Sequence, residues 1–305
     1  VEAAIVELDY VPSAVARSLK ARSTATIGLL VPNSVNPYFA ELARGIEDAC
    51  ERNGYCVILC NSDDNPQKQR SYLRVLLEKR IDGLVVASVG QDDDLLQSLA
   101  GVRTPMVIVD RELEGVDADL VRIDHEQGAY LATRHLLELG HRDVAYIGGP
   151  AETGVTQLRL SGFRRAMAEA GAPVLGSRVL HCDFTSPGGH AAAAQVLEGK
   201  RPSAIFAGND MIGFGVLRAA AERNISVPGE LSVIGFDDIE LSRYVYPPLT
   251  TVGQSILELG ESAASLLLTR IATPRQGAAE QRIVAPRIVL RESTGPRPDL
   301  FNEYR

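Results

Sequence analysis

Several side chains that could bind a hydroxyl-rich ligand stand directly after hydrophobic runs of the sequence. Sugar hydroxyls both donate and accept hydrogen bonds, so a sugar site needs carboxylates that accept and arginine or asparagine side chains that donate. The candidates at the ends of these runs, with an arginine that opens a helical stretch and a late glutamine, are Asp110, Arg111, Arg159, Asn209, Asp210, Asp237 and Gln254. Any one of them alone has the alternative interpretation of a helix cap or a surface charge. As a set at strand ends, they favour a binding site.

The sequence lacks the motifs of the common enzyme classes. It contains no GxxxxGK[ST] phosphate loop, no GxGxxG turn after the first strand, no GxSxG elbow and no HExxH motif. His125, His135 and His141 flank a helical stretch with one polar face, and we expect them at the surface or as caps. The sequence therefore predicts a binding protein that is not an enzyme and needs no metal ion or cofactor.

A short basic segment near the N-terminus stands out from an acidic chain. The net charge of −8 argues against a nucleic-acid partner. Residues 12–25, PSAVARSLKARSTA, nevertheless contain three basic residues and no acidic one. On a short helix Ala16, Leu19 and Lys20 would present an apolar wedge and a cation together, as minor-groove binders do; the alternative is a solvated linker. A helix over 13–20 is marginal in length, so we expect it to be disordered unless it is docked.

Composition and cysteine usage indicate an ordinary globular protein. The chain has 305 residues, 45% hydrophobic and 23% charged, which is enough apolar side chain for two cores of about 150 residues each. Neither a membrane span nor a secretion signal is visible, so we expect a soluble, cytoplasmic protein. The four cysteines lack CxxC spacing, and Cys56 and Cys60 fall in an expected buried strand; this predicts reduced core thiols.

From Ala25 onward, short β-branched runs alternate with amphipathic stretches of helical length, which predicts βαβ units and parallel sheets covered on both faces. The expected strands are 26–31, 55–60, 83–87, 106–110, 143–148, 178–181, 203–208 and 231–236. The expected helices are 37–53, 66–79, 124–139, 156–170, 187–198 and 210–223. Segments 111–119 and 247–254 are candidate crossovers between two tandem α/β lobes, and such folds usually bind ligands in a cleft outside the carboxyl ends of the strands.

Long stretches of the sequence resemble the LacI family of bacterial transcription regulators. The segment LDYVPSAVARSLKARSTATIGLLVPN (8–33) is similar to the end of the last headpiece helix, the hinge and the first core strand of that family. The resemblance continues in family order through NPYFAELARGIEDACERNGY (36–55), LEKRIDGLVV (77–86), LELGHRDVAYIGGP (137–150), RLSGFRRAMAEAG (159–171), AGNDMIGFGVLRAA (207–220) and VIGFDDIELSRYVYPPLTTV (233–252). It covers almost the whole chain except a helix-turn-helix, which the sequence as given lacks.

The resemblance implies an α/β fold of two tandem Rossmann-like lobes, of the type I periplasmic-binding-protein kind, preceded by a hinge. Residues 1–25 would be the headpiece remnant and hinge helix, 26–122 plus 255–282 the first lobe, and 123–254 plus 283–305 the second. Leu19 matches the leucine that paired hinge helices insert into operator DNA. The implied DNA-binding residues of the hinge are Ser13, Ala16, Arg17, Leu19 and Lys20. Pairing of two hinges implies a homodimer, with 66–79 and 83–87 as the expected contact region.

The core also resembles the periplasmic ribose-binding proteins, which implies a small sugar effector, a pentose such as ribose, between the lobes. The residues that match their sugar site are Asn36, Phe39, Asp110, Arg111, Arg159, Asn209, Asp237 and Gln254. Tyr38 stands where they have phenylalanine. Phe184 matches an aromatic residue that stacks on the base in purine-binding members of the family, whereas Thr153 stands near the position where those members have arginine. A purine is therefore less favoured than a sugar.

Three classes of function remain open at this point. A ligand-responsive repressor explains both the hinge and the core, and it would use a sugar or, as the alternative, a purine or nucleoside. A periplasmic-type sugar receptor explains the core alone and requires a signal peptide. An α/β enzyme explains neither the hinge nor the core. About sixty residues with a helix-turn-helix pattern upstream of Val1 would distinguish the regulator from the others.

Overall fold

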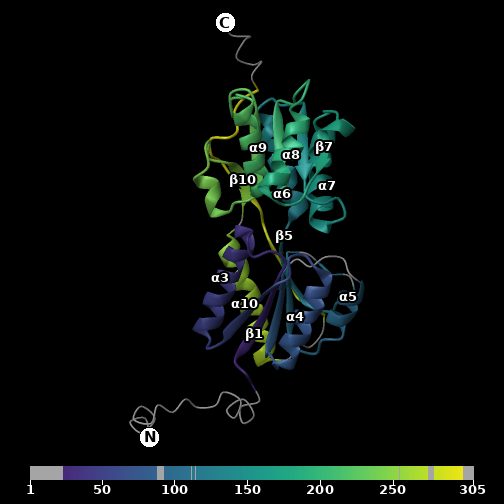
Figure 1. The fold of residues 1–305 in the computed structure, drawn as a ribbon, viewed down its shortest axis with the longest axis vertical. Helices are drawn as coiled ribbons and strands as arrows, with labels where there is room; N and C mark the ends of the chain where they lie inside the picture. The colour runs from purple at the N-terminus through teal and green to yellow at the C-terminus, as the bar shows by residue number, and fades with distance from the viewer. Residues whose placement is uncertain are drawn as a thin grey trace, which may run out of the picture. The chain divides into compact units, whose positions relative to one another are not determined.

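The computed structural model describes residues 23–87, 93–110, 112–113, 115–253, 255–273 and 278–297 (Figure 1). These residues fall into two compact units. The described residues of unit 1 lie within 23–33, 43–120 and 261–280, and those of unit 2 lie within 34–42, 121–260 and 281–297. All five predicted hinge residues, as well as Arg111 and Gln254, lie outside the described residues.

The first sheet has the strand order β11-β5-β4-β3-β1-β2, and its pairs β1–β2, β1–β3 and β3–β4 are parallel. Its strands are β1 (Thr26–Val31), β2 (Cys56–Asn61), β3 (Gly83–Ala87), β4 (Met106–Val109), β5 (Asp119–Ile123) and β11 (Gln281–Val284). The associated helices are α3 (Pro37–Arg52), α4 (Pro66–Glu78), α5 (Asp93–Ala100) and α10 (Ile256–Ala272).

Helices pack on both faces of the first sheet. Leu30, Leu84 and Val86 contribute to a buried cluster with Leu73 and Leu76 of α4. On the opposite face α10 lies so close to β3 that a Cβ atom at Gly83 would be 2.9 Å from Ile271 Cδ1 and 3.0 Å from Leu267 Cδ1. Because both faces are covered, these strands are apolar throughout, as parallel sheets require.

The second sheet has the strand order β12-β10-β9-β8-β6-β7; apart from the antiparallel β10–β12 pair, its pairs β10–β9, β9–β8, β8–β6 and β6–β7 are parallel. Its strands are β6 (Val144–Gly148), β7 (Val179–His181), β8 (Ala204–Ala207), β9 (Ser232–Asp237), β10 (Thr250–Gly253) and β12 (Arg287–Val289). Its helices are α6 (His125–Glu138), α7 (Gly154–Glu169), α8 (Ser186–Val196) and α9 (Asp210–Glu222), with short 3-10 turns at Gly176–Arg178 and Glu240–Arg243.

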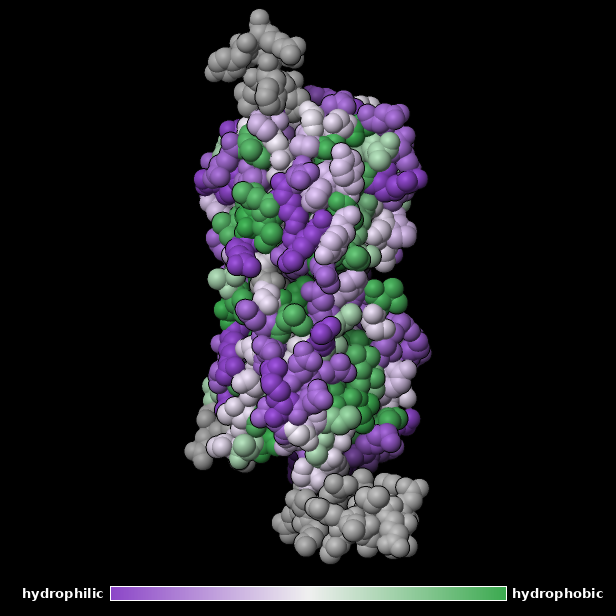
Figure 2. All heavy atoms as spheres, turned by 90° about the vertical axis from the view of Figure 1, so that its left-hand side faces the viewer, coloured by the Kyte–Doolittle hydropathy of each residue, from purple (hydrophilic) through white to green (hydrophobic). Residues whose placement is uncertain are grey.

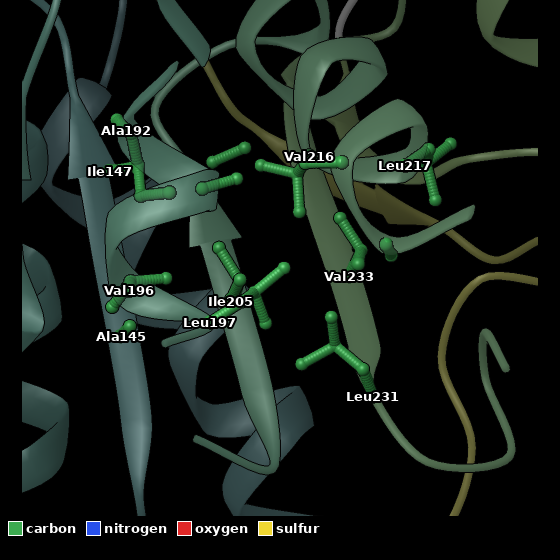
Figure 3. Close-up of a cluster of buried hydrophobic side chains, with 14 of the residues drawn as sticks. Ala145, Ile147, Ala192, Val196, Leu197, Ile205, Val216, Leu217, Leu231 and Val233 are labelled. Carbon is green, nitrogen blue, oxygen red and sulfur yellow. The ribbon is translucent and has the colours of Figure 1, made fainter. Parts of the chain in front are cut away.

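Alternate residues of each central strand supply the two apolar cores of unit 2. Ala145 and Ile147 of β6 face the cluster formed with α8 and α9, which Figure 3 shows around Ile205, Val216 and Val233. The intervening residues, such as Tyr146, belong to a second cluster with α6 and α7. This alternation is the period-two pattern of a strand that is buried on both faces.

The structure confirms the predicted α/β class with two sheets of mostly parallel strands, but the sequence analysis missed several elements. Helices α5 and α10 and strands β5, β11 and β12 were not predicted. Segment 247–254, expected to be an extended crossover, is extended over β10, which lies in the interior of the second sheet. Cys56 is exposed, contrary to the prediction, because β2 is the edge strand of its sheet; all four cysteines are free thiols.

Two histidines that were expected at the surface or as caps are buried. His141 is fully buried; its Nδ1 lies 2.9 Å from Ser203 Oγ, and its Nε2 lies 3.0 Å from both Ser232 Oγ and the Gly295 carbonyl oxygen. Burial lowers the pKa of His141 below its ordinary value. His125 is also fully buried. The surface prediction was wrong because the C-terminal segment, far away in the sequence, covers His141.

The exposed surface is mixed in character. Figure 2 shows one face of the molecule, on which hydrophilic residues predominate and hydrophobic residues form smaller patches. Within the part of the chain that the structure describes, no helix is both long and apolar enough to cross a membrane.

Candidate ligand-binding site

The centre of the candidate site is the guanidinium group of Arg159. Helix α7, which carries Arg159, follows β6, and the partners of Arg159 come from the ends of the neighbouring strands β8 and β9 and from the start of α6. One guanidinium nitrogen donates to the Gly208 carbonyl oxygen at 2.5 Å, and the other lies 3.2 Å from Asp237 Oδ1 and 3.3 Å from His125 Nδ1. The Arg159 side chain is only 6% exposed and that of Asp237 8%. Arg159 and Asp237, predicted from the sequence as site residues, therefore form one buried ion pair.

The Arg159 guanidinium has unused hydrogen-bonding capacity. Its carbon atom lies 3.9 Å from the centroid of the Phe236 ring, which stabilises the buried cation from one side. Its Nε is buried and has no hydrogen-bond partner. Buried polar groups are nearly always satisfied in native proteins, so an orphan donor next to a charged pair marks a place where a ligand can contribute an acceptor.

Two aspartates at strand ends have unfavourable backbone conformations. Asp110 follows β4 with φ of 81°, and Asp237 ends β9 with φ of 111°. Both residues are buried, with 6% of their surface exposed. Residues other than glycine adopt such angles at a cost of about 1 to 3 kcal/mol, and they cluster at functional sites. These angles support a functional interpretation of both carboxylates.

The aromatic ring of Phe184 lies against Gly149, which follows β6. A Cβ atom at Gly149 would be 2.1 Å from Phe184 Cζ, so a residue with a side chain at this position would displace the ring. Phe184 is only partly buried and packs against the α8–α9 cluster. A ring held in this way offers an apolar surface of the kind that contacts the C–H face of a sugar or a flat base.

The two predicted asparagines are helix caps in the structure. Asn36 Oδ1 accepts a hydrogen bond from the Tyr38 backbone at 3.1 Å, at the start of α3, and Asn209 Oδ1 accepts one from Ile212 at 2.9 Å, at the start of α9. Tyr38 is 5% exposed, and its ring meets that of Phe39 edge to face at 5.1 Å. Capping uses the side-chain oxygen, so each cap also fixes the orientation of its amide group.

Asp210, a candidate ligand-binding residue in the sequence analysis, has a structural role instead. Its carboxylate is fully buried and accepts hydrogen bonds from the Thr251 hydroxyl at 2.5 Å, the Ser242 hydroxyl at 2.7 Å and the Ile239 backbone at 3.0 Å. Burial raises the pKa of Asp210 to about 7, and the charge of Asp238 adds to the increase, whereas the three hydrogen bonds oppose it. Asp210 holds the loop after β9 against β10 rather than facing a ligand.

Sequence analysis missed two residues of this cluster, His125 and Phe236, which contact the Arg159 guanidinium. A signal for Phe236 was present: alternation along β9 places it on the same face of the sheet as α7. The described residues contain no group of histidine, cysteine or acidic side chains that could hold a metal ion. The donors, acceptors and rings brought together in unit 2 can form hydrogen bonds with a ligand and contact an apolar face of it.

Doubly wound α/β units with polar clusters at the ends of their parallel strands define a ligand-binding protein of the type I periplasmic-binding class. A family model described as periplasmic binding proteins and sugar binding domain of the LacI family matches residues 24–292. The chain therefore belongs to this family, as the sequence resemblance predicted.

Individual relatives agree with this assignment. The HTH-type transcriptional repressor PurR of Proteus mirabilis is 44% identical over 306 residues, which cover 99% of this chain and 89% of the relative. A LacI family transcriptional regulator from Enterococcus faecium, solved with bound ribose, is 34% identical, with a TM-score of 0.80 and coverage of 89% of this chain and 99% of that one. The transcription regulator CcpA of Lactococcus lactis is 29% identical, with a TM-score of 0.82 and coverage of 88% and 98%.

Proposed function

We propose that the protein is a ligand-responsive transcriptional repressor that acts on operator DNA in the cytoplasm. Its family membership and its similarity to an HTH-type repressor over 99% of the chain support this function. The basic segment 12–25 supplies the cations and the apolar residue that a DNA-contacting hinge requires. The relatives named above are transcription regulators, which supports a protein that binds its effector without chemical turnover.

The effector that we propose is a pentose, with ribose as the first candidate. The observation that carries this proposal is the buried Arg159–Asp237 pair with its orphan Nε donor. A carboxylate accepts from neighbouring hydroxyls and a guanidinium donates to them, which is the pattern that sugars need. The ribose-bound relative from Enterococcus faecium, 34% identical, supports the same ligand class. The residues proposed to contact the effector are Asn36, Tyr38, Phe39, Asp110, Arg111, Arg159, Phe184, Asn209, Asp237 and Gln254.

A purine or nucleoside is the second candidate, because the relative with 44% identity is a repressor named PurR and because Phe184 provides a ring surface for stacking. Isothermal titration calorimetry of the chain against pentoses, hexoses, nucleosides and free purines distinguishes the two candidates. We expect ribose to bind at least about tenfold more tightly than any hexose or purine. Tight purine binding without a sugar response would contradict the proposal that the effector is a pentose. It would not affect the proposed repressor function.

We also propose that the protein is a homodimer through unit 1. The sequence prediction placed 66–79 and 83–87, which correspond to α4 and β3, at the contact, but β3 is fully buried and paired on both sides. We therefore keep helix α4 in the proposed interface and replace β3 by the exposed edge strand β2. Strand β2 and helix α4 expose three large apolar side chains, Leu59 (40%), Val75 (37%) and Leu77 (36%).

Replacing both Leu59 and Leu77 by glutamate is expected to dissociate this dimer, because each substitution would bury a charge in the interface. Sedimentation should give about twice the 32.8 kDa chain mass for the wild type and the single mass for the double variant. Leu175→Glu, at a 52% exposed position of unit 2, is the matched control and should remain dimeric. A monomeric wild type at micromolar concentration would refute the proposal.

A further inference from the structure

The carboxylate of Asp82 in unit 1 accepts hydrogen bonds from residues 23–25, which lead into β1. Asp82 lies between Ile81 and β3. Its Oδ2 accepts hydrogen bonds from the Ser23 hydroxyl at 2.6 Å and the Ala25 amide at 2.8 Å, and its Oδ1 accepts from the Thr24 amide at 3.0 Å. The two oxygens of this one side chain therefore accept hydrogen bonds from three consecutive residues, which lie 57 to 59 positions away in the sequence.

The backbone of this segment has a conformation that needs such a partner. Ala25 has a φ of 49°, in the left-handed region that residues other than glycine avoid. Successive amides next to a left-handed residue point toward one side and form a concave anion-binding surface, which here receives the Asp82 carboxylate. Without that charge, the amides of Thr24 and Ala25 would lose their acceptor, and the left-handed conformation of Ala25 would no longer be stabilised.

Further hydrogen bonds join residues 24–26 to the chain next to β2 and β3. The Thr24 hydroxyl donates to the Arg80 carbonyl oxygen at 2.9 Å. The Asp82 amide donates to Thr26 at 2.8 Å, and the Cys56 amide donates to Ala25 at 2.9 Å. Residues 23–26 therefore make hydrogen bonds with residues at the starts of β2 and β3. The three cations of the basic segment, Arg17, Lys20 and Arg22, precede them in the sequence.

We propose that Asp82 is a positioning residue for DNA binding: it fixes the direction in which the N-terminal segment leaves unit 1 and so couples that segment to the effector-binding core. The inference rests on the proposed repressor function, because it assumes that this segment contacts DNA. A hinge that leaves a rigid body at a set angle reaches its DNA site with less loss of conformational freedom than one that swivels. Asp82 itself contacts neither DNA nor effector.

The first test uses the chain alone and requires no DNA. Amide exchange at Thr24 and Ala25 is measured in the wild type, Asp82→Ala, Asp82→Asn and the control Asp63→Asn, an exposed carboxylate of the same unit that pairs with Lys68. We expect at least about tenfold faster exchange in Asp82→Ala, a smaller change in Asp82→Asn and none in the control, with the β3 amides unchanged. Unaltered exchange at Thr24 and Ala25 in Asp82→Ala would overturn the proposal that Asp82 fixes this segment.

The second test measures function in the form of the regulator that carries the DNA-reading headpiece of its HTH-type relatives. The probe is a genomic DNA fragment that the wild-type protein selects. Asp82→Ala should bind it at least about tenfold more weakly, while ribose affinity and the melting temperature stay near the wild-type values. If amide exchange at Thr24 and Ala25 is faster but DNA affinity is unchanged, the proposed coupling between the N-terminal segment and the core is wrong. A wild type that binds ribose but selects no DNA would instead overturn the repressor function itself.

Discussion

Replacing Arg159 by alanine is expected to weaken ribose binding by about tenfold to several hundredfold, because charge-assisted hydrogen bonds in a buried site contribute about 1.5 to 3 kcal/mol each. The substitution also leaves the Asp237 carboxylate, 8% exposed, without the guanidinium 3.2 Å away. Removing one partner of a buried ion pair costs more than removing an exposed contact. Calorimetric titration with ribose measures the change, and urea unfolding shows whether the variant is still folded.

The same helix offers a matched control for this substitution. Arg165 is also on α7, but its side chain is 41% exposed and pairs with Glu126 at 2.8 Å. Arg165→Ala removes an equal charge and a similar volume, and exposed ion pairs contribute little to stability. We expect its ribose affinity to stay within about twofold of the wild type. An equal loss of affinity in both variants would show that net charge, rather than the Arg159 geometry, determines binding.

Replacing Asp210 by alanine is expected to lower the free energy of unfolding by about 3 kcal/mol, since three buried donors lose their acceptor at once. These are the Thr251 and Ser242 hydroxyls and the Ile239 amide. Urea denaturation followed by circular dichroism measures the loss. Asp183→Ala provides the comparison, because Asp183 is exposed and accepts a hydrogen bond from the nearby Thr185 hydroxyl. Comparable destabilisation by the two substitutions would disprove the special role of Asp210.

The raised pKa of Asp210 also determines how this loss depends on pH. The carboxyl releases its proton near its ordinary pKa of 3.8 in the unfolded chain but near 7 in the folded protein. Between these values the folded state binds more protons, so the contribution of Asp210 to stability is complete below pH 3.8 and is lost as the pH rises through about 7. The difference in unfolding free energy between wild type and Asp210→Ala should therefore be larger at acidic than at alkaline pH. A difference that grows with pH would contradict the assignment.

The central strands could be predicted from the sequence because they are apolar on both faces. Runs such as 26–31 and 83–87 have bounds that agree with the structure. The missed strands β11 and β12 are short and only partly buried, so they have no comparable hydrophobic signal. Their positions depend on pairing with strands more than thirty residues away, as in the β10–β12 ladder, and no local pattern encodes such pairing.

For the candidate site, the sequence indicated which strand ends carry polar groups but not what each group contacts. Asn209 and Asp210 are neighbours, yet Asn209 caps α9 while Asp210 binds hydroxyls from two distant segments. Arg159 and Asp237 are 78 residues apart, and their pairing required the order of the strands in the sheet. His125 has no sequence signal for its burial, because histidine is intermediate in its tendency to be buried.

The position of α10 on the first sheet has a consequence for how the protein is made on the ribosome. Leu267 and Ile271, which cover Gly83, are synthesised after β6, β8, β9 and β10 of the second sheet. While those strands emerge, the two side chains of α10 that lie next to Gly83 of β3 have not yet been synthesised. Uncovered apolar surface on growing chains is what chaperones bind and what promotes aggregation. Unit 1 therefore completes its folding late in translation, although most of its sequence is translated first.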